Sequence, residues 1–161
     1  MNTNIAVVLG IFIAIVGVGV FLATGGQVDD EVLAIRESVG EIVIYKSPTC
    51  GCCGVYASYM RNLGYDVRIE DTDDLSVIKR GFGIPSSVES CHTTEVAGYI
   101  IEGHVPEEAI QKLLVEQPDI KGIGMGGMPS GSPGMPGPQT EDFVIYEITH
   151  EGRVGDVFIT L

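Results

Sequence analysis

The chain has 161 residues, which is enough for one compact domain with short appendages. Its 22 acidic and 9 basic residues give a net charge of −13 at pH 7, and all of them lie in residues 29–161. A domain this acidic repels phosphate backbones and anionic lipid headgroups and attracts cations, so we expect no nucleic acid partner. The same charge also suits an ordinary soluble surface, so by itself it does not identify a metal-binding protein.

The N-terminal part of the chain is strongly apolar. Residues 5–23 are apolar or glycine throughout, and no charged side chain precedes Asp29. Because about 20 such residues cross a bilayer as a helix, residues 1–28 are predicted to be a transmembrane anchor or, alternatively, a signal segment. The uncleaved anchor is favoured, since the small residues at 23–25 match a cleavage site only loosely. We expect the domain that follows to be extracytoplasmic and tethered to the membrane through this helix.

The rest of the chain alternates between helical and strand patterns. In chain order, the first predicted elements are a short capped helix in 29–40, a strand at 42–45, a helix from the cysteine-rich turn to Gly64, and a strand at 65–70. They are followed by a helix carrying Leu75 and Ile78 that stops at Gly81, a strand at 96–101, and a helix from Pro106 that carries Ile110, Leu113 and Leu114. This order predicts an α/β fold in which helices cover a sheet.

Residues 122–138 differ in composition, with seven Gly, four Pro and three Met in 17 positions. Such a segment is predicted to be a loop within the domain of residues 41–161. Because thioethers are soft ligands that suit copper(I), Met128 is a candidate ligand, together with Met125 and Met135; the alternative is a plain linker. The chain then ends with a predicted β-hairpin formed by 143–148 and 154–161.

Three of the four cysteines, Cys50, Cys52 and Cys53, lie within four positions between a predicted strand and a predicted helix. The positive end of a helix favours the thiolate, which is both the attacking nucleophile and the metal-binding form of cysteine. A structural disulfide from this turn to Cys91 is an alternative, but it would leave two thiols over. A redox pair needs two sulfurs, whereas a soft-metal site benefits from three or four.

The fourth cysteine, Cys91, is followed by His92 just ahead of the predicted strand at 96–101. In thioredoxin-like folds, the loop entering this strand faces the cysteine turn. If this fold holds, Cys91 and the candidate ligand His92 complete the cluster. His104 and His150 are weaker candidates. Thiolates select copper(I), and zinc also fits a site of three cysteines and one histidine.

Four motifs recur in the order of a known family. They are YKSPTCGCC at 45–53, SCHT at 90–93, the glycine, tyrosine and EGHVP residues within 98–106, and GMP with GSPGM within 127–135. With these motifs the chain from about Glu41 onwards resembles the CopG-like copper-resistance family, which is unrelated to the plasmid repressor of the same name. The resemblance implies a thioredoxin-like fold, an exported location and copper binding by Cys50, Cys52 and Cys53, with Cys91 from the second motif.

The sequence therefore supports an extracytoplasmic copper(I)-binding protein that acts in copper resistance, transfer or copper redox handling. It would hold one copper or a small polynuclear thiolate cluster, and other copper-handling proteins are possible partners. The alternative is a membrane-anchored thiol–disulfide oxidoreductase with Cys50 as nucleophile and Cys53 as resolving thiol. Cys52 would interfere with that reaction, and Pro85 lies too far upstream to be the cis-proline that such enzymes carry before the third strand. Copper binding is favoured, and whether the protein is an enzyme stays open.

Overall fold

The computed structural model describes residues 34–161. The predicted anchor at 1–28 lies outside the described residues, as does the first part of the predicted helix at 29–40, which is helical from 34 to 38. Within residues 34–161, no helix has the length and apolar character needed to cross a membrane. Residues 36–161 form one compact unit.

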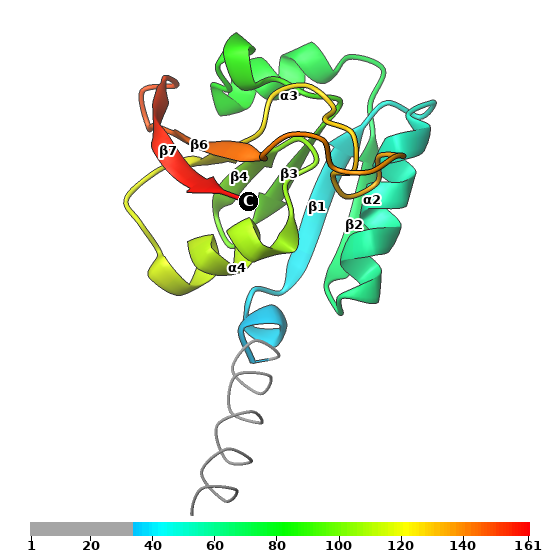
Figure 1. The fold of residues 1–161 in the computed structure, drawn as a ribbon, viewed down its shortest axis with the longest axis horizontal. Helices are drawn as coiled ribbons and strands as arrows, with labels where there is room; N and C mark the ends of the chain where they lie inside the picture. The colour runs from blue at the N-terminus through cyan, green and yellow to red at the C-terminus, as the bar shows by residue number, and fades with distance from the viewer. Residues whose placement is uncertain (1–33) are drawn as a thin grey trace, which may run out of the picture. The chain divides into compact units, whose positions relative to one another are not determined.

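The strands and helices of this unit follow the predicted alternation (Figure 1). In chain order they are β1 (Glu41–Lys46), α2 (Gly51–Asn62), β2 (Asp66–Asp71), α3 (Leu75–Phe82), the 3₁₀ turn η1 (Ser86–Val88), β3 (His92–Val96), β4 (Tyr99–Glu102), α4 (Glu107–Glu116), β5 (Gly122–Gly124), β6 (Val144–Ile148) and β7 (Val154–Thr160). The strands form one mixed sheet in the order β2-β1-β3-β4-β5-β6-β7. The fold is therefore mixed α/β, as the sequence predicts, and β6 and β7 are the expected antiparallel hairpin.

The predicted strand at 96–101 is only partly confirmed. Residues 99–101 belong to β4, but Ala97 and Gly98 form a turn with positive φ values of 48° and 85°, and Val96 is the last residue of β3. The rest of β3, which begins at His92, was not predicted as a strand. The predicted loop at 122–138 also begins with a short strand, β5. At Gly122 a Cβ atom would lie 1.8 Å from the carbonyl oxygen of Ile100, so only glycine allows β5 to approach β4 this closely.

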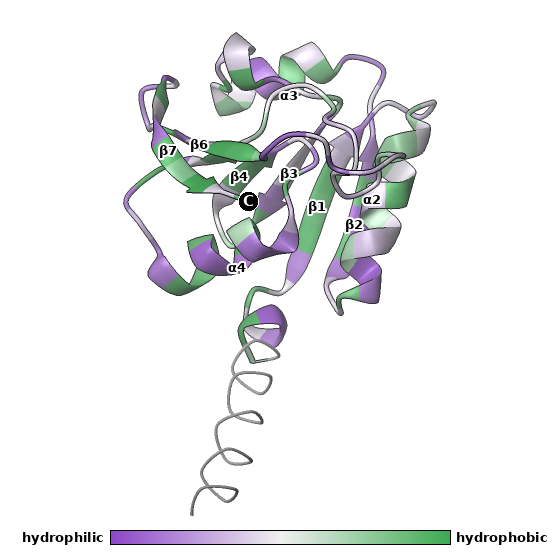
Figure 2. Cartoon of the chain, in the orientation of Figure 1, coloured by the Kyte–Doolittle hydropathy of each residue, from purple (hydrophilic) through white to green (hydrophobic). Residues whose placement is uncertain are grey.

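Helix α2 covers one face of the sheet. The ring of Tyr56 on α2 lies 4.4 Å from that of His92 on β3, and the Tyr56 hydroxyl donates to the Val105 carbonyl, two residues before α4. The Tyr59 hydroxyl accepts the Glu107 amide in turn, so the first turn of α4 is bonded to α2. The core residues of these elements are apolar, and β1 is hydrophobic through its middle (Figure 2). The most deeply buried of them include Ile42, Ile44, Met60, Ile101, Ile110 and Leu113.

Helix α3 covers the opposite face. Neighbouring residues of a strand point to opposite sides of a sheet, and Thr93 follows His92 directly. Lys79 of α3 donates to Thr93, and Phe82 stacks obliquely on Tyr45 of β1 at 5.7 Å between ring centroids. A second core cluster lies on this side and consists of Ile84, Val88, Ile100 and Ile148, with Phe82 and Tyr146 packed against it. The sheet therefore separates the α2 side, where the cysteines lie, from the α3 side.

Candidate metal site

The chain turns from β1 into α2 over a few residues, and this turn places the cysteines. The Cys50 amide donates to the Ser47 carbonyl at 3.0 Å, and Cys50 is the N-cap of α2 with φ −75° and ψ 97°. Cys52 and Cys53 lie in the first helical turn, where backbone N–H groups have no partner within the helix. These groups and the helix dipole make the first turn of a helix a favourable place for negative charge.

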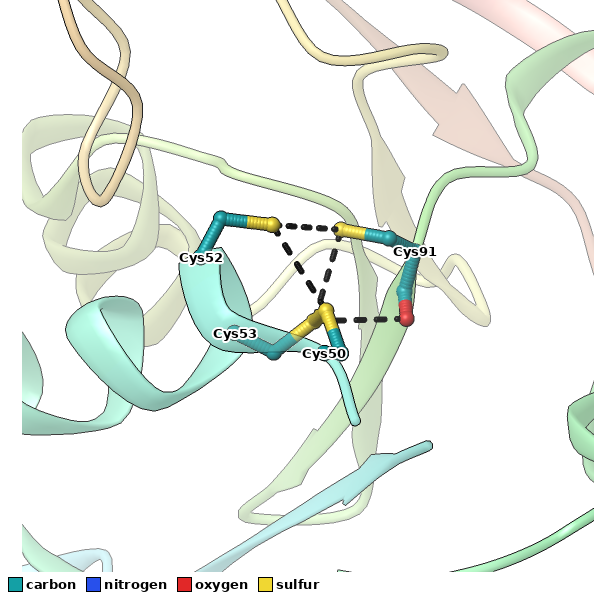
Figure 3. Close-up of side chains that lie close together, drawn as sticks. All are labelled: Cys50, Cys52, Cys53 and Cys91. Atoms are coloured by element: carbon teal, nitrogen blue, oxygen red, sulfur yellow. Dashed lines mark hydrogen bonds between the residues drawn. A yellow bond between two sulfur atoms is a disulfide. The ribbon is translucent and has the colours of Figure 1, made fainter. Parts of the chain in front are cut away.

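All four cysteines lie together, as predicted from the sequence (Figure 3). Cys50 and Cys53 form a disulfide with a Cα–Cα distance of 5.4 Å, whereas Cys52 and Cys91 are free thiols. The Cys91 sulfur lies 3.8 Å from the Cys52 sulfur and 3.5 Å from the Cys53 sulfur. The four sulfur atoms lie within 4.8 Å of one another, which is close enough for one soft metal ion or a small cluster.

Two histidines extend the cluster on the side of Cys91. The Cys91 sulfur lies 3.0 Å from Nε2 of His104 and 3.6 Å from Nδ1 of His92. Both imidazoles are fully buried. Burial lowers the pKa of His104, and burial together with the nearby His104 and Lys79 holds the pKa of His92 well below its usual range. Both rings are therefore neutral at physiological pH, which is the form that binds metal ions.

The Gly/Pro/Met loop at 122–138 folds over this cluster. Gly134 has φ +85°, and a Cβ atom there would lie 2.8 Å from the Cys52 carbonyl oxygen and 2.9 Å from the Tyr56 amide nitrogen. Only glycine therefore lets the loop lie against the first turn of α2. The Pro133 carbonyl accepts a hydrogen bond from Nδ1 of His104 at 2.6 Å. Earlier in the loop, the Gly127 amide donates to the carbonyl of Glu89, so the loop is bonded on both sides of the site.

The methionines of this loop differ in burial. Met125 is buried and its amide donates to the Glu102 carbonyl, whereas the Met128 side chain is 54% exposed. Metal ligation by Met128 stays a prediction. His150 lies at the β6–β7 turn, where it contacts Asp119 at 3.1 Å.

The carboxylate of Glu102 is a buried group next to Cys91 and His92 in the structure, and it was not identified from the sequence. It accepts the Ser90 amide and the Thr93 hydroxyl, each at 2.6 Å, and pairs with Lys79 of α3. Glu102 therefore binds the chain on both sides of Cys91 and His92. Burial raises the pKa of Glu102, although Lys79 acts in the opposite direction. No local pattern marks this residue, because its partners lie on other segments of the chain.

The environment of Cys91 favours the protonated thiol at neutral pH. Burial, together with the neighbouring Cys52, raises the pKa of Cys91 to about 11. A metal ion binds the thiolate, so binding at Cys91 must displace a proton.

The mixed α/β domain therefore gathers four cysteines and two buried histidines next to the N-terminus of one helix, a set of ligands that could hold a soft metal ion. Residues 88–135 match the model of a family described as "Protein of unknown function, DUF411". Two solved structures, "Copper resistance protein copG- Form 1" and "Form 2", are 33% and 34% identical to this chain, each with a TM-score of 0.69. They cover 76% and 75% of this chain, which in turn covers 98% and 97% of theirs. The chain therefore belongs to the CopG family of copper resistance proteins, as the resemblance predicts. No curated protein sequence matched the chain.

Proposed function

We propose that this protein binds copper(I) and acts in copper resistance, with Cys50, Cys52, Cys53 and Cys91 as the ligands. The observation that carries the proposal is the gathering of four sulfur atoms from two separate segments within 4.8 Å. Thiolates are soft ligands that select copper(I), although zinc also accepts such a set. The two similar solved structures, which are named as copper resistance proteins, support copper as the metal.

The redox state of the turn sets how many ligands are available. Reduction of the Cys50–Cys53 disulfide by a dithiol consumes two electrons and two protons, and it yields two thiols while the dithiol becomes a disulfide. The reduced protein then offers four sulfurs. The disulfide form offers only Cys52 and Cys91 as free thiols. The four-sulfur site is therefore a property of the reduced protein.

We further propose that the domain is thioredoxin-like. In support, β1 and β2 are parallel and joined by α2, β3 and β4 form an antiparallel hairpin, and α2 and α3 lie on opposite faces. The apolar run at 5–23 supports a membrane anchor with the domain on the extracytoplasmic side, where it would meet incoming copper and other copper-handling proteins. We propose no nucleic acid partner, because the domain is strongly acidic.

A second candidate function is thiol–disulfide exchange, favoured by the Cys50–Cys53 disulfide at the N-terminus of α2. Cys50 would attack a substrate disulfide as a thiolate, and Cys53 would release the reduced substrate by forming the observed bond. Two further thiols would divert the intermediate, because the Cys52 sulfur lies 3.5 Å from that of Cys50 and the Cys91 sulfur lies 3.5 Å from that of Cys53. Residues 34–161 also contain no cis peptide bond. Copper binding therefore accounts for more of the site.

The test is an anaerobic copper(I) titration of the reduced full chain against a competing chelator. We expect at least one tightly bound copper per chain, and we expect Cys52→Ser to lower the affinity by at least about tenfold. The matched control is His150→Gln, because His150 is exposed and lies outside the cluster. Full stoichiometry and affinity in Cys52→Ser, or no binding by the wild type, would contradict the proposal. A Cys52→Ser variant that keeps disulfide reductase activity would instead support the second candidate.

A further inference from the structure

The cluster divides into two overlapping groups that share one residue, Cys91. One group is the four cysteines, and the other is Cys91 with His92 and His104. The disulfide removes Cys50 and Cys53 from the first group but takes nothing from the second. A sulfur and two imidazole nitrogens therefore stay together in the disulfide form.

The distances within the second group suit one metal ion. The Cys91 sulfur lies 3.0 Å from Nε2 of His104 and 3.6 Å from Nδ1 of His92, and all three atoms lie within 4.8 Å of one another. A tetrahedral ion with metal–sulfur bonds of about 2.3 Å and metal–nitrogen bonds of about 2.0 Å holds its sulfur and nitrogen ligands about 3.5 Å apart. The observed spacing needs little rearrangement to accept such an ion.

The nitrogen lone pairs also suit ligation. The hydrogen bond to the Pro133 carbonyl puts the proton of the neutral His104 ring on Nδ1 and leaves the lone pair of Nε2 facing Cys91. A backbone carbonyl commonly holds a metal-binding histidine in this way.

His92 supplies an independent observation. Its side chain is fully buried, its Nε2 has no hydrogen-bond partner among the described residues, and its Nδ1 makes only the long contact with Cys91. Because this 3.6 Å contact is the only one that Nδ1 makes, its lone pair is available to a metal ion held by Cys91. The ring proton would then lie on Nε2, the nitrogen without a partner.

We propose that Cys91, His92 and His104 form a second metal site, which binds a divalent ion of the zinc class when Cys50 and Cys53 are oxidised. One thiolate and two imidazoles leave the fourth position of a tetrahedral ion open for solvent, as in sites with an exchangeable ligand. The state of the disulfide then selects between a four-sulfur site for copper(I) and a mixed site for a divalent ion. The mixed site does not require the four-sulfur site to bind copper.

The test uses the full chain carrying Cys52→Ser, with the Cys50–Cys53 disulfide intact, so that Cys91 is the only free thiol. The probe is Co²⁺, added without oxygen, because it gives a thiolate-to-metal charge-transfer band and the intense visible bands of a tetrahedral ion. We expect one Co²⁺ per chain, displaced by Zn²⁺. His104→Gln in the same background should weaken binding by at least about tenfold, and the control His150→Gln should leave it unchanged.

Absence of the charge-transfer band, or equal affinity in the His104→Gln variant, would overturn the proposal. A second measurement needs no histidine substitution: stoichiometric Zn²⁺ should slow alkylation of Cys91 by iodoacetamide at least about tenfold, and unchanged alkylation would overturn the proposal as well. The two proposals fail separately. The four-sulfur site predicts that Cys52→Ser loses copper(I) affinity in the reduced chain, whereas the mixed site predicts that the same variant binds Co²⁺ in the disulfide form.

Discussion

Nδ1 of His104 lies 2.6 Å from the carbonyl oxygen of Pro133, so a loop rich in glycine and proline determines which nitrogen of this histidine faces the cysteines. The other ring nitrogen, Nε2, lies 3.0 Å from the sulfur of Cys91. The loop is therefore part of the site's construction, because it covers the first turn of α2 and also fixes the tautomer of a candidate ligand.

Gly134→Ala should disturb the site through this loop. The added Cβ would lie 2.8 Å from the Cys52 carbonyl oxygen in a backbone with φ +85°, so the loop must move and Pro133 must leave His104. We expect a loss of stability of at least about 1 kcal/mol and weaker copper(I) binding, measured by urea unfolding and chelator competition. Gly127→Ala is the matched control, because Gly127 also has a positive φ but its Cβ would meet nothing within 4 Å. Equal effects of the two variants on copper affinity would contradict the expectation.

Lys79→Met should strongly destabilise the domain. It leaves the carboxylate of Glu102 buried without its counter-charge, and breaking such a pair costs about 3–5 kcal/mol. Urea unfolding of the metal-free chain at neutral pH measures this cost. The double variant Lys79→Met with Glu102→Leu should recover much of the stability, because no isolated charge remains. It should still bind copper more weakly, since Ser90 loses its hydrogen-bond partner.

The control for this pair is Arg153→Met. Arg153 is exposed and its ion pair with Glu151 lies at the surface, so its removal should change stability by no more than about 0.5 kcal/mol. A Lys79→Met variant that is no less stable than Arg153→Met would show that the buried pair contributes little.

Cys91 should react slowly with alkylating agents at neutral pH. Its pKa is raised to about 11, so the thiolate fraction at pH 8 is only about a thousandth, and the rate should rise with pH until about pH 11. Iodoacetamide labelling of the metal-free disulfide form, mapped by mass spectrometry, measures this profile. Cys52→Ser should speed labelling of Cys91 at a given pH, because the neighbouring Cys52 contributes to the raised pKa. A rate that levels off near pH 9 would be inconsistent with this environment.

Tyr56→Phe should affect stability without changing the number of metals bound. The variant leaves the buried carbonyl of Val105 without the Tyr56 hydroxyl, at a cost of about 1 kcal/mol. Tyr99→Phe removes a bond of the same 3.0 Å length to Pro118, but that pair is only partly buried and water can replace the hydroxyl. We therefore expect the Tyr99 variant to lose less stability in urea unfolding. A change in copper stoichiometry in Tyr56→Phe would mean that the hydroxyl acts on the site itself.

The sequence by itself was sufficient for the features that depend on neighbouring residues. The alternation of strands and helices, the closing β-hairpin and the position of Cys50, Cys52 and Cys53 at a helix start follow from periodicity and from local stop signals. Such features are encoded within a few residues, because each depends on backbone preferences and on one buried face. The β3–β4 turn was missed because Ala97 adopts a positive φ, for which alanine gives no signal.

The tertiary structure decided what lies next to Cys91. His104 follows it by 13 positions, and Pro133 comes from a loop whose sequence reads only as irregular. The buried pair of Glu102 and Lys79 likewise joins β4 to α3. These contacts depend on strand register and on the face that each side chain takes, and a shift of one residue would turn the side chains to the other side of the sheet. Only the packed sheet therefore brings the two histidines to the sulfurs, because no local pattern encodes distances between segments far apart in the chain.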